Sequence, residues 1–478
     1  MSGFRSVAFG LAALVATAAG CGTPYEGLPT RKRVLLITVD TLRDDHLSSR
    51  GYDRTTTPFV DSLLAGGITF TNAVTPIART TQALASLLTG RYPKDHGVRL
   101  LFDSLGDGVP HLACLARDRG YETIAVVSNH ILTAERGLGR GFSVYDHAPD
   151  ARNAAANTRD ALRHVADVDS DAALFLWVHY IDPHVPYFPP ADVVDAFDPG
   201  YAGPFADGFG ALPGGIGESA YPTELGKVNA VYRNRLPERV NAHVRRLYAA
   251  EIRRTDNAIA ELVEKLRADL GEDWLIVFTS DHGEELGEHG LHYDHGDSVS
   301  EPALRVPLGI ALPEGDPLHR VGRVDTRVSL VDLLPTLAEL LDLDLPTESA
   351  HELGRSLVPA FRGVSLADRS TFAETGQSFY PDHVPRRVDF SVSGRLRSIA
   401  RGDHKLIFTP GLPAGSAFEL YDLARDPAER HDLYRADHPA APPLQAELAD
   451  WLGGDTAHAG RRPSDADRKA LRELGYVE

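Results

Sequence analysis

Four runs of apolar residues along the chain each stop at a polar residue. They are VLLITVD, TIAVVSN, ALFLWVHYID and WLIVFTSD, which end at Asp40, Asn129, Asp182 and Asp281. Continuous runs rich in Val, Ile, Leu and Phe are typical of strands buried on both faces of a parallel sheet. Helical patterns lie between them, so the chain predicts a doubly wound α/β sheet. Because ligands of such sheets bind outside the carboxyl ends of the strands, we expect the four polar side chains to converge on one crevice.

Two further segments of this domain have distinct patterns. Residues 238–270 are predicted to form one long helix, with apolar residues at Val244, Leu247, Ile252 and Ile259. Residues 188–237 are rich in Pro, Gly, Ala and Asp, which predicts a long insertion. A loop of that length in a compact domain is usually functional, so we expect a loop or lid near the crevice.

The segment DHGEELGEHGLHYDHG follows the last apolar run and combines carboxylates with imidazoles. It begins with Asp281 and His282 and contains three more histidines, His289, His292 and His295. Carboxylate and imidazole side chains at a strand end are suited to a divalent metal ion. The alternative is a solvated, histidine-rich loop, and the other runs that end at ligand-type residues argue against it.

The stretch TTQALASLLTG predicts a helix from Thr80 to Gly90, with Thr80 or Thr81 at its N-cap. A threonine there is often only a cap. The functional interpretation is a nucleophile, because a helix N-terminus favours an anion such as phosphate or sulfate. Metal coordination would lower the pKa of the hydroxyl. Arg79, directly upstream, would add a forked contact to the oxygens of the anion.

The N-terminus has the pattern of an export signal. MSGFR is a short positive start, SVAFGLAALVATAAG is apolar and too short to span a membrane well, and small residues precede Cys21. This resembles a bacterial lipoprotein signal, with Ala18 where that signal prefers Leu. We expect residues 1–21 to be a signal peptide, with Cys21 lipidated, and residues 22–32 a tether. The alternative is an ordinary secretory signal, and both place the protein in the cell envelope or periplasm.

The composition limits the partners. The chain has 478 residues, 43% of them hydrophobic, and a net charge of −18. An acidic protein is a poor ligand for nucleic acid, so no nucleic-acid partner is expected. An anionic substrate must then be held by local positive charge, above all by a metal ion.

Several ordered motifs resemble the sulfatase family of the alkaline phosphatase superfamily. They are VLLITVDTLRDDHL, TTPFVDSLLAGGITFTNAV, SLLTGRYPKDHGV, SDHGEELGEHG, RVPLGI and VSLVDLLPTLAELLDL. The segments RSIARGDHKLIFTP and ELYDLARDPAERHDL resemble the small C-terminal domain of that family. The resemblance implies an alkaline-phosphatase/sulfatase-like catalytic domain over residues 33–366 and a small α+β domain over residues 370–478. Lys405 is expected to be structural, at the interface of the two.

The resemblance also implies roles for individual residues. One divalent ion would be bound by four ligands: Asp40, Asp281, His282 and the Thr80 hydroxyl. This ligand set would accept Ca²⁺, Mn²⁺ or Zn²⁺. His130, His184 and His295 occupy positions at which the family binds its substrate. The remaining predicted substrate-binding residues are Arg79 and Asn129.

The chain departs from the family at the nucleophile. Family members carry a cysteine or serine in C/S-x-P-S-R, which is oxidised to formylglycine, whereas Thr80, Gln82, Ala83 and Leu84 stand here. A second family aspartate is replaced by Thr41. Threonine cannot become formylglycine, so no formylglycine is expected. A threonine nucleophile is similar to that of phosphodiesterases and of the phosphoethanolamine transferases of the bacterial envelope.

These departures favour an exported, metal-dependent hydrolase that cleaves phosphate monoesters, phosphate diesters or related anionic esters through Thr80. The substrate would be an anionic small molecule, glycan or lipid ester. Two alternatives stay open. One is a sulfuric ester hydrolase that works without formylglycine. The other is a non-catalytic binding lipoprotein with a decayed site, although buried polar side chains at strand ends are costly to keep without a function.

Overall fold

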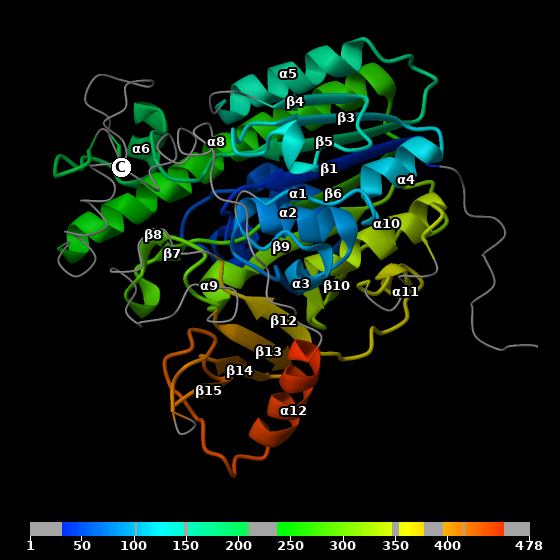
Figure 1. The fold of residues 1–478 in the computed structure, drawn as a ribbon. Helices are drawn as coiled ribbons and strands as arrows, with labels where there is room; N and C mark the ends of the chain where they lie inside the picture. The colour runs from blue at the N-terminus through cyan, green and yellow to red at the C-terminus, as the bar shows by residue number, and fades with distance from the viewer. Residues whose placement is uncertain are drawn as a thin grey trace, which may run out of the picture.

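The main sheet contains the predicted strands. The computed structural model describes residues 31–100, 103–147, 152–206, 208–209, 237–346, 353–376, 395–413 and 416–453. Within them a nine-stranded sheet has the order β10-β2-β9-β6-β1-β5-β3-β4, with β11 also paired to β2 (Figure 1). Its strands are β1 (Arg33–Val39), β2 (Ile68–Val74), β3 (Glu122–Val127), β4 (Val144–His147), β5 (Leu174–Tyr180), β6 (Trp274–Ser280), β9 (Arg305–Ala311), β10 (Gly322–Val324) and β11 (Val328–Ser329).

The four apolar runs form adjacent parallel strands, β3, β5, β1 and β6. Their registers align the last residues, so that Val39 of β1 lies between Tyr180 of β5 and Ser280 of β6. The chain therefore leaves these strands at one edge of the sheet, as the sequence predicts.

Strand β9 is the exception to a parallel sheet, because it runs antiparallel to both β2 and β6. The segment between β6 and β9 contains only short elements: β7 (Glu285–Leu286), β8 (His292–Asp294) and the helix α9 (Glu301–Leu304). A parallel return needs a crossover, usually a helix, that brings the chain back to the opposite edge. The chain instead stays at the carboxyl edge of the sheet after β6 and enters β9 from that edge, so β9 runs antiparallel to its neighbours.

Helices cover both faces of the main sheet, which confirms the doubly wound prediction. Alternate residues of β1 point to opposite faces. Val34 and Leu36 belong to one buried core with Leu84 and Leu337, whereas Leu35 and Ile37 belong to another with Leu247. The first face carries α2 (Thr80–Thr89), α4 (Leu112–Asp118) and α10 (Leu333–Leu341), and the second carries α1 (Pro58–Ala65), α5 (Ala154–Ala166) and α8 (Glu238–Leu270).

Helix α8 has the predicted bounds, Glu238–Leu270. Val244, Leu247, Ile252 and Ile259 are all buried in it, as the apolar spacing requires. It begins after Pro237 and ends before Gly271, which has a φ of 89°. Proline and a left-handed glycine favour these two ends, because each is poorly accommodated inside a helix. The other α-helices in the described part of the chain are α3 (Pro93–His96), α6 (Ala191–Phe197) and α11 (Val358–Phe361).

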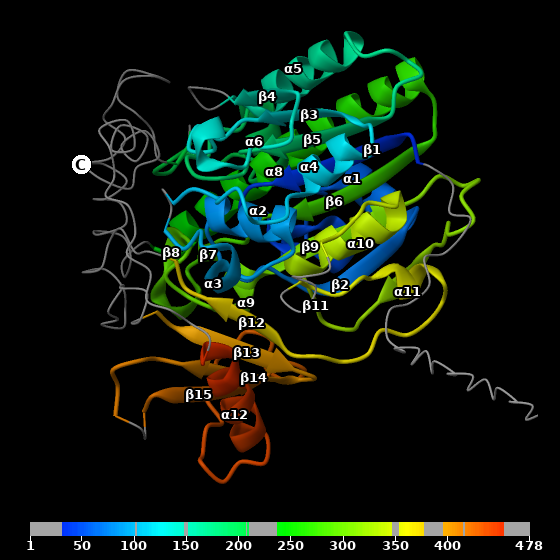
Figure 2. The ribbon, with the colours of Figure 1, turned by 45° about the vertical axis from the view of Figure 1, so that its right-hand side comes forward.

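A separate antiparallel sheet lies below the main sheet in Figure 2. Its strands β12 (Thr371–Glu374), β13 (Arg397–Arg401), β14 (His404–Phe408) and β15 (Phe418–Asp422) pair in chain order, and α12 (Ala441–Leu452) packs on them. The predicted α/β fold with a small C-terminal α+β unit is therefore confirmed.

Lys405 of β14 joins the small sheet to the large one, as predicted. Its Nζ lies 2.9 Å from Glu301 Oε1 of α9 and 2.8 Å from Glu429 Oε1, and the lysine is fully buried. Glu301 also pairs with Arg327 at 2.7 Å. Burial raises the pKa of Glu429, and the nearby Lys405 charge opposes that change.

Replacing this lysine is expected to destabilise the protein strongly. Lys405→Met should lower the free energy of unfolding by about 3–5 kcal/mol, because Glu429 is left as a buried charge without its partner. Lys265→Met is the matched control, since its pair with Asp269 is exposed and contributes about 0–1 kcal/mol. Thermal unfolding would measure both, and equal Tm values for the two variants would contradict this account.

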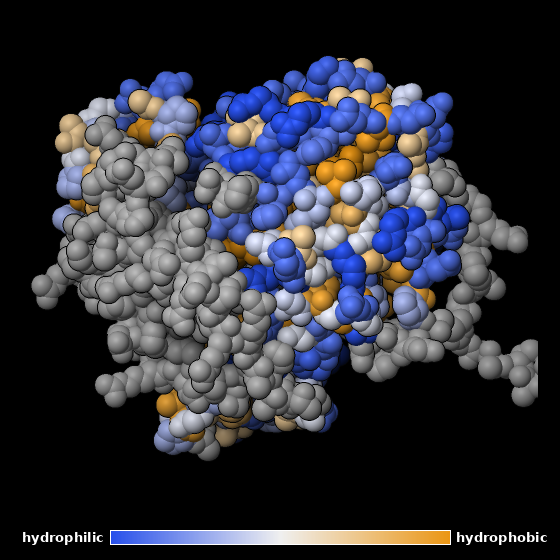
Figure 3. All heavy atoms as spheres, turned by 45° about the horizontal axis from the view of Figure 1, so that its top comes forward, coloured by the Kyte–Doolittle hydropathy of each residue, from blue (hydrophilic) through white to orange (hydrophobic). Residues whose placement is uncertain are grey.

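Several of the sequence predictions concern residues outside the described part of the chain. The signal peptide, Cys21 and nearly all of the predicted tether fall outside the described residues, as does most of the 188–237 insertion. None of the described helices has the length and apolarity needed to cross a bilayer. On the face shown in Figure 3, hydrophilic residues predominate and hydrophobic ones occur in small groups among them.

Candidate metal centre and nucleophile

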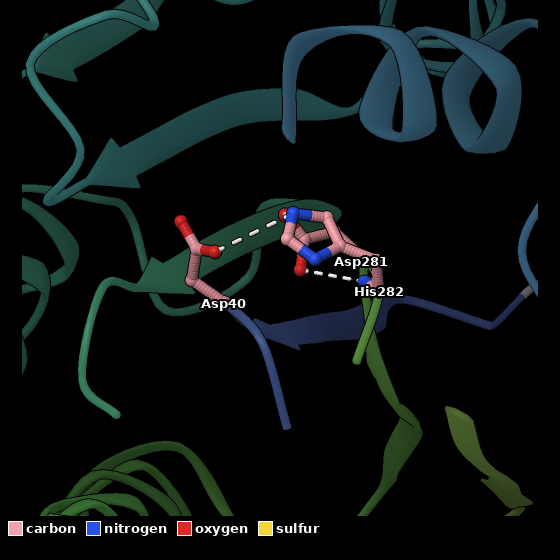
Figure 4. Close-up of side chains that lie close together, drawn as sticks. All are labelled: Asp40, Asp281 and His282. Atoms are coloured by element: carbon pink, nitrogen blue, oxygen red, sulfur yellow. Dashed lines mark hydrogen bonds and ion pairs between the residues drawn. The ribbon is translucent and has the colours of Figure 1, made fainter. Parts of the chain in front are cut away.

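Asp40, Asp281 and His282 meet at the carboxyl edge of the main sheet (Figure 4). Asp40 follows β1, and Asp281 and His282 follow the adjacent strand β6. One ligand-type atom from each lies within 4.8 Å of the others, and all three residues are buried. The structure thus brings together three of the four predicted metal ligands.

Each carboxylate has one oxygen held by the protein and one oxygen left over. Asp40 Oδ2 accepts a hydrogen bond from Asn129 Nδ2 at 2.9 Å, and Asp281 Oδ1 accepts from the His282 N–H at 2.7 Å. Asp40 Oδ1 and Asp281 Oδ2 are buried without a hydrogen-bond partner among the described residues. A buried carboxylate oxygen without a partner is costly, so a cation between these two oxygens fits the site.

The His282 ring is oriented for metal binding. Its Nδ1 lies 2.9 Å from Gly283 O, so Nδ1 carries the proton and donates to that carbonyl. Its Nε2 then presents a lone pair, 3.7 Å from Asp40 Oδ1 and 3.5 Å from Asp281 Oδ2. A lone pair that faces carboxylate oxygens is repelled by them, and a cation would turn the repulsion into shared coordination.

The pKa values of the cluster show the same electrostatic conflict. Burial would raise the pKa of Asp40, but the contact with His179 and the charges of the nearby histidines lower it to about 2. Burial and the Asp40 charge raise the pKa of Asp281 well above its usual value. Burial lowers the pKa of His282 to about 4. Without a cation, the cluster therefore holds one ionised carboxylate, one carboxyl that resists ionisation and a neutral imidazole.

Thr41, in the position of the second family aspartate, is held in a left-handed backbone conformation with a φ of 57°. A β-branched residue rarely adopts this conformation, and such strain is frequent at functional sites. The turn places the Thr41 N–H 3.2 Å from Asp281 Oδ1, and the Tyr248 hydroxyl donates to Thr41 O at 2.7 Å. Thr41 thus helps to fix the Asp281 carboxylate.

Thr80 lies beside the cluster at the start of α2. Its Oγ1 is 3.4 Å from His282 Nε2, and the residue is buried. The N-cap of α2 is Arg79, and Thr80 is the first helical residue, so the prediction that Thr80 or Thr81 is the cap is wrong. The difference arises because Arg79 still has extended backbone angles, φ −149° and ψ 128°. The Thr80 hydroxyl is directed to the Asp40/Asp281/His282 cluster and has no capping role among the described contacts.

Arg79 is enclosed by two glycines from distant parts of the chain. A Cβ on Gly296 would lie 2.0 Å from Arg79 Nε, and one on Gly376 would lie 2.4 Å from Arg79 Cγ. The Gly376 N–H donates to Gly296 O at 2.8 Å, which ties the end of β12 to the loop after β8. Arg79 Nη2 is 3.5 Å from Asp297 Oδ1. The guanidinium is therefore held in place by backbone that tolerates no side chain, and its charge acts on His282 and His295.

Gly376→Ala should reduce kcat/KM by roughly 10- to 100-fold, because the added methyl group must displace Arg79 and small misplacements of anion-binding groups are costly. Gly315→Ala is the control, since a Cβ there meets nothing within 4 Å. Steady-state kinetics on an anionic ester would measure the effect. Unchanged kinetics in Gly376→Ala would show that Arg79 does not need this position.

The predicted substrate-binding histidines form a row beside the metal ligands. The His295 ring centroid is 4.4 Å from that of His282 and 5.2 Å from that of His184. His295 Nδ1 lies 3.2 Å from Glu284 Oε1. Burial lowers the pKa of His295 well below its usual value, and burial raises that of Glu284. His130 is buried directly after Asn129 in the turn that follows β3.

Two parts of the sequence interpretation need correction. Asp182 follows β5 but does not join the cluster, because its Oδ2 accepts the backbone N–H of Ala154 at 2.5 Å, at the start of α5. The four strand ends therefore deliver three side chains to the site, not four. Of the histidines, His289 bonds to Ala428 O at 3.0 Å instead of facing the metal ligands.

Three contributors to the site were missed by sequence reasoning. His179 Nε2 lies 3.6 Å from Asp40 Oδ2, and Glu284 and Asp297 contact His295 and Arg79. His179 is inside a strand, where a buried polar residue in an apolar run was the only available signal. Glu284 and Asp297 lie in the acidic segment after β6, where the sequence does not show which acids face inward.

The fold and the buried Asp/Asp/His cluster define an α/β enzyme with a metal-type site at its strand ends. A family model of sulfatases matches residues 32–343, which is more than half of the chain. The chain belongs to the sulfatase family, whose enzymes are metal-dependent, and is a sulfatase-family ester hydrolase.

Individual proteins show the same relationship. The chain is 33% identical to a choline-sulfatase of Rhizobium meliloti over 231 residues, which are 48% of this chain and 40% of that protein. It is 26% identical to the uncharacterized sulfatase YidJ of Escherichia coli, over 84% of this chain and 83% of that protein. A solved phosphonate monoester hydrolase of Agrobacterium radiobacter superimposes with a TM-score of 0.69 at 23% identity, over 89% of this chain and 95% of that one.

Proposed function

We propose that this protein is a metal-dependent hydrolase of phosphate monoesters, phosphate diesters or related anionic esters, with Thr80 as its nucleophile. One observation supports this most directly: the Thr80 hydroxyl lies 3.4 Å from His282 Nε2, next to the two carboxylates. The ion would be held by Asp40, Asp281, His282 and Thr80. It would lower the pKa of the Thr80 hydroxyl and neutralise charge on the substrate.

The identity of the nucleophile favours phosphorus over sulfur. A formylglycine hydrate can expel sulfate without attack at sulfur, but a threonine has no such route. A threonine ester of sulfate would need water to attack at sulfur, whereas a threonine ester of phosphate is hydrolysed by ordinary attack at phosphorus. Thr80 therefore suits phosphoryl chemistry.

In the proposed mechanism, Arg79 and the first turn of α2 orient the oxyanion of the substrate. The Thr80 oxygen forms a bond to phosphorus as its proton leaves, and the bond from phosphorus to the leaving oxygen breaks. The proton of Thr80 passes to solvent and the leaving oxygen takes up a proton from solvent, while His184 and His295 are positioned to contact the substrate. Water then attacks phosphorus, the bond to Thr80 breaks, and phosphate or a phosphate monoester is released.

The proposed substrate is an anionic small molecule, glycan or lipid ester. Structural neighbours support the small-molecule and glycan parts of this range. One was solved with D-glucosamine-2-N,6-O-disulfate as its substrate and another with k-i-k-neocarrahexaose, and two others are phosphonate monoester hydrolases. For the ion, two carboxylates, an imidazole and a hydroxyl suit Ca²⁺, Mn²⁺ or Zn²⁺.

The test combines metal analysis with three parallel assays. The purified protein should contain about one divalent ion per chain, and nitrophenyl phosphate or bis-nitrophenyl phosphate should turn over faster than nitrophenyl sulfate. Faster turnover of the sulfate would contradict the proposed reaction but not the metal site. It would establish the alternative of a sulfatase without formylglycine, which the 33% identity to a choline-sulfatase favours.

The second alternative is a binding lipoprotein with a decayed site. The loss of the C/S-x-P-S-R motif supports it. The two unpaired carboxylate oxygens oppose it, because a decayed site has no reason to keep them buried. Absence of bound metal together with absence of turnover on all three esters would establish this alternative.

We also propose that the protein is exported to the cell envelope or periplasm and anchored by a lipid on Cys21. The proposal rests on the sequence of the first 21 residues. The mature protein should begin at Cys21 and fractionate with membranes, and Cys21→Ser should release it. A soluble mature protein with another N-terminus would disprove the anchor, and an intact N-terminus in the cytoplasm would disprove export.

A further inference from the structure

A second cavity lies apart from the metal cluster, beside the junction of the large and small sheets. Its volume is about 540 Å³. Its walls come from the 44–50 segment after β1, from β2, from α9 and β9, from β10 and from the 427–430 loop after β15. Figure 1 shows α9 between the large sheet and the small one. None of Asp40, Thr80, Asp281 and His282 lines the cavity.

Arginines dominate the charge of the cavity. Arg43, Arg50, Arg305, Arg323 and Arg430 line it. Arg43 is neutralised by Asp45 and Glu288, at 2.7 and 2.9 Å.

Arg323 pairs with Asp325 at 2.6 Å, and the other three cations are less well neutralised. Arg50 and Arg305 share the carboxylate of Asp44, with Nε–Oδ distances of 2.9 and 3.5 Å. Within the described part of the chain, the Arg430 guanidinium has no ion pair, and Arg430 is exposed. The five arginines thus have four carboxylate partners, Asp44, Asp45, Glu288 and Asp325, while the lining Glu301 is paired with Arg327 and Lys405. The cavity therefore carries a small excess of positive charge, although the chain as a whole has a net charge of −18.

Two arginine N–H groups at the cavity lack acceptors. Arg50 Nη2 is buried without a hydrogen-bond partner among the described residues, and Arg305 Nε, although 3.5 Å from Asp44 Oδ2, forms no hydrogen bond there either. Because Arg50 and Arg305 both contact Asp44, their guanidinium groups lie close together. A buried donor without an acceptor is destabilising, and an anionic ligand would supply the missing acceptors. Guanidinium groups bind phosphate and sulfate oxygens in forked geometry.

We propose that this cavity is a second ligand site, which binds a small organic molecule that carries a phosphate or sulfate group. The Arg50 and Arg305 groups would hold the anionic group, and Arg430 would close over it from the 427–430 loop. A volume of about 540 Å³ exceeds the needs of a bare oxyanion and is typical of small-molecule sites. The site does not depend on the chemistry proposed for Thr80.

The test uses the full-length protein with Asp281→Asn, because loss of a metal ligand removes anion binding at the first site. Calorimetric titration with glucose 6-phosphate, inorganic phosphate and inorganic sulfate should show one binding event. Adding Arg305→Gln or Arg430→Ser should weaken it about tenfold or more, the usual effect of losing a hydrogen bond to a charged group. Arg430→Ser is safe for folding, because that side chain is exposed.

Arg425→Ser is the matched control, since Arg425 is exposed, pairs only at 3.6 Å with Asp422 and does not line the cavity. It should leave binding unchanged. Tighter binding of glucose 6-phosphate than of phosphate would support an organic ligand, and equal binding would overturn that part of the proposal. No binding of any probe at 10 mM (about the weak limit for a specific site), or binding unaffected by Arg305→Gln and Arg430→Ser, would overturn the site.

Discussion

Thr80→Ala is expected to lower kcat by at least about 10³-fold, because removal of a nucleophile leaves only binding and charge stabilisation. The fold should survive. The Thr80 side chain makes no capping bond in the described structure, and its hydroxyl contacts His282 Nε2 at 3.4 Å. Circular dichroism and Tm would check the fold, and initial rates on a nitrophenyl phosphate ester would measure the loss.

Three comparison variants make this result specific. Thr80→Ser retains an alcohol and should keep part of the activity. Thr80→Cys should not yield a strong sulfatase, because Gln82 and Leu84 do not restore the maturation motif. Thr81→Ala is the matched control, since Thr81 is buried beside Thr80 but its hydroxyl has no described partner. Full activity in Thr80→Ala with loss in Thr81→Ala would transfer the role to Thr81.

The sequence predicts the core of the fold well, for a physical reason. Strands buried on both faces must be apolar throughout, so β1, β3, β5 and β6 are visible as continuous runs. The long amphipathic helix α8 is visible because its apolar spacing persists over 33 residues. Strand β9 was not predicted to be antiparallel, since direction depends on where the connecting segment crosses and not on the residues of the strand.

The candidate site was predictable where it depends on strand ends and less so elsewhere. The positions of Asp40, Asn129 and Asp281 follow directly from the ends of the parallel strands β1, β3 and β6. Asp182 has the same local pattern, and only the three-dimensional structure shows that it binds the N-terminus of α5. The enclosure of Arg79 by Gly296 and Gly376 joins residues that are far apart in sequence, so no local pattern could reveal it.

Asp281→Asn should have opposite effects on stability in the presence and absence of metal. Burial and the Asp40 charge raise the pKa of Asp281 in the folded protein, so its ionisation opposes folding above its unfolded pKa of about 3.9. In metal-free protein at pH 7, Asn should therefore raise Tm, because it keeps the shape and removes the charge. This advantage should shrink as the pH falls through about 3.9, because below that pH Asp281 is protonated in both states.

Bound metal should reverse the stability order, so that the wild type becomes more stable than Asp281→Asn. At one hundred times its Kd, an ion stabilises the wild type by about 2.7 kcal/mol. Asp281→Asn loses a charged ligand and should gain little stability from the same ion, and it should lose most of its turnover. Thermal unfolding after chelation, and again after addition of Ca²⁺, Mn²⁺ or Zn²⁺, would measure both effects. A metal-free Asp281→Asn protein that is less stable than metal-free wild type would contradict the electrostatic conflict described at the site. An equal gain from metal in both proteins would exclude Asp281 as a ligand.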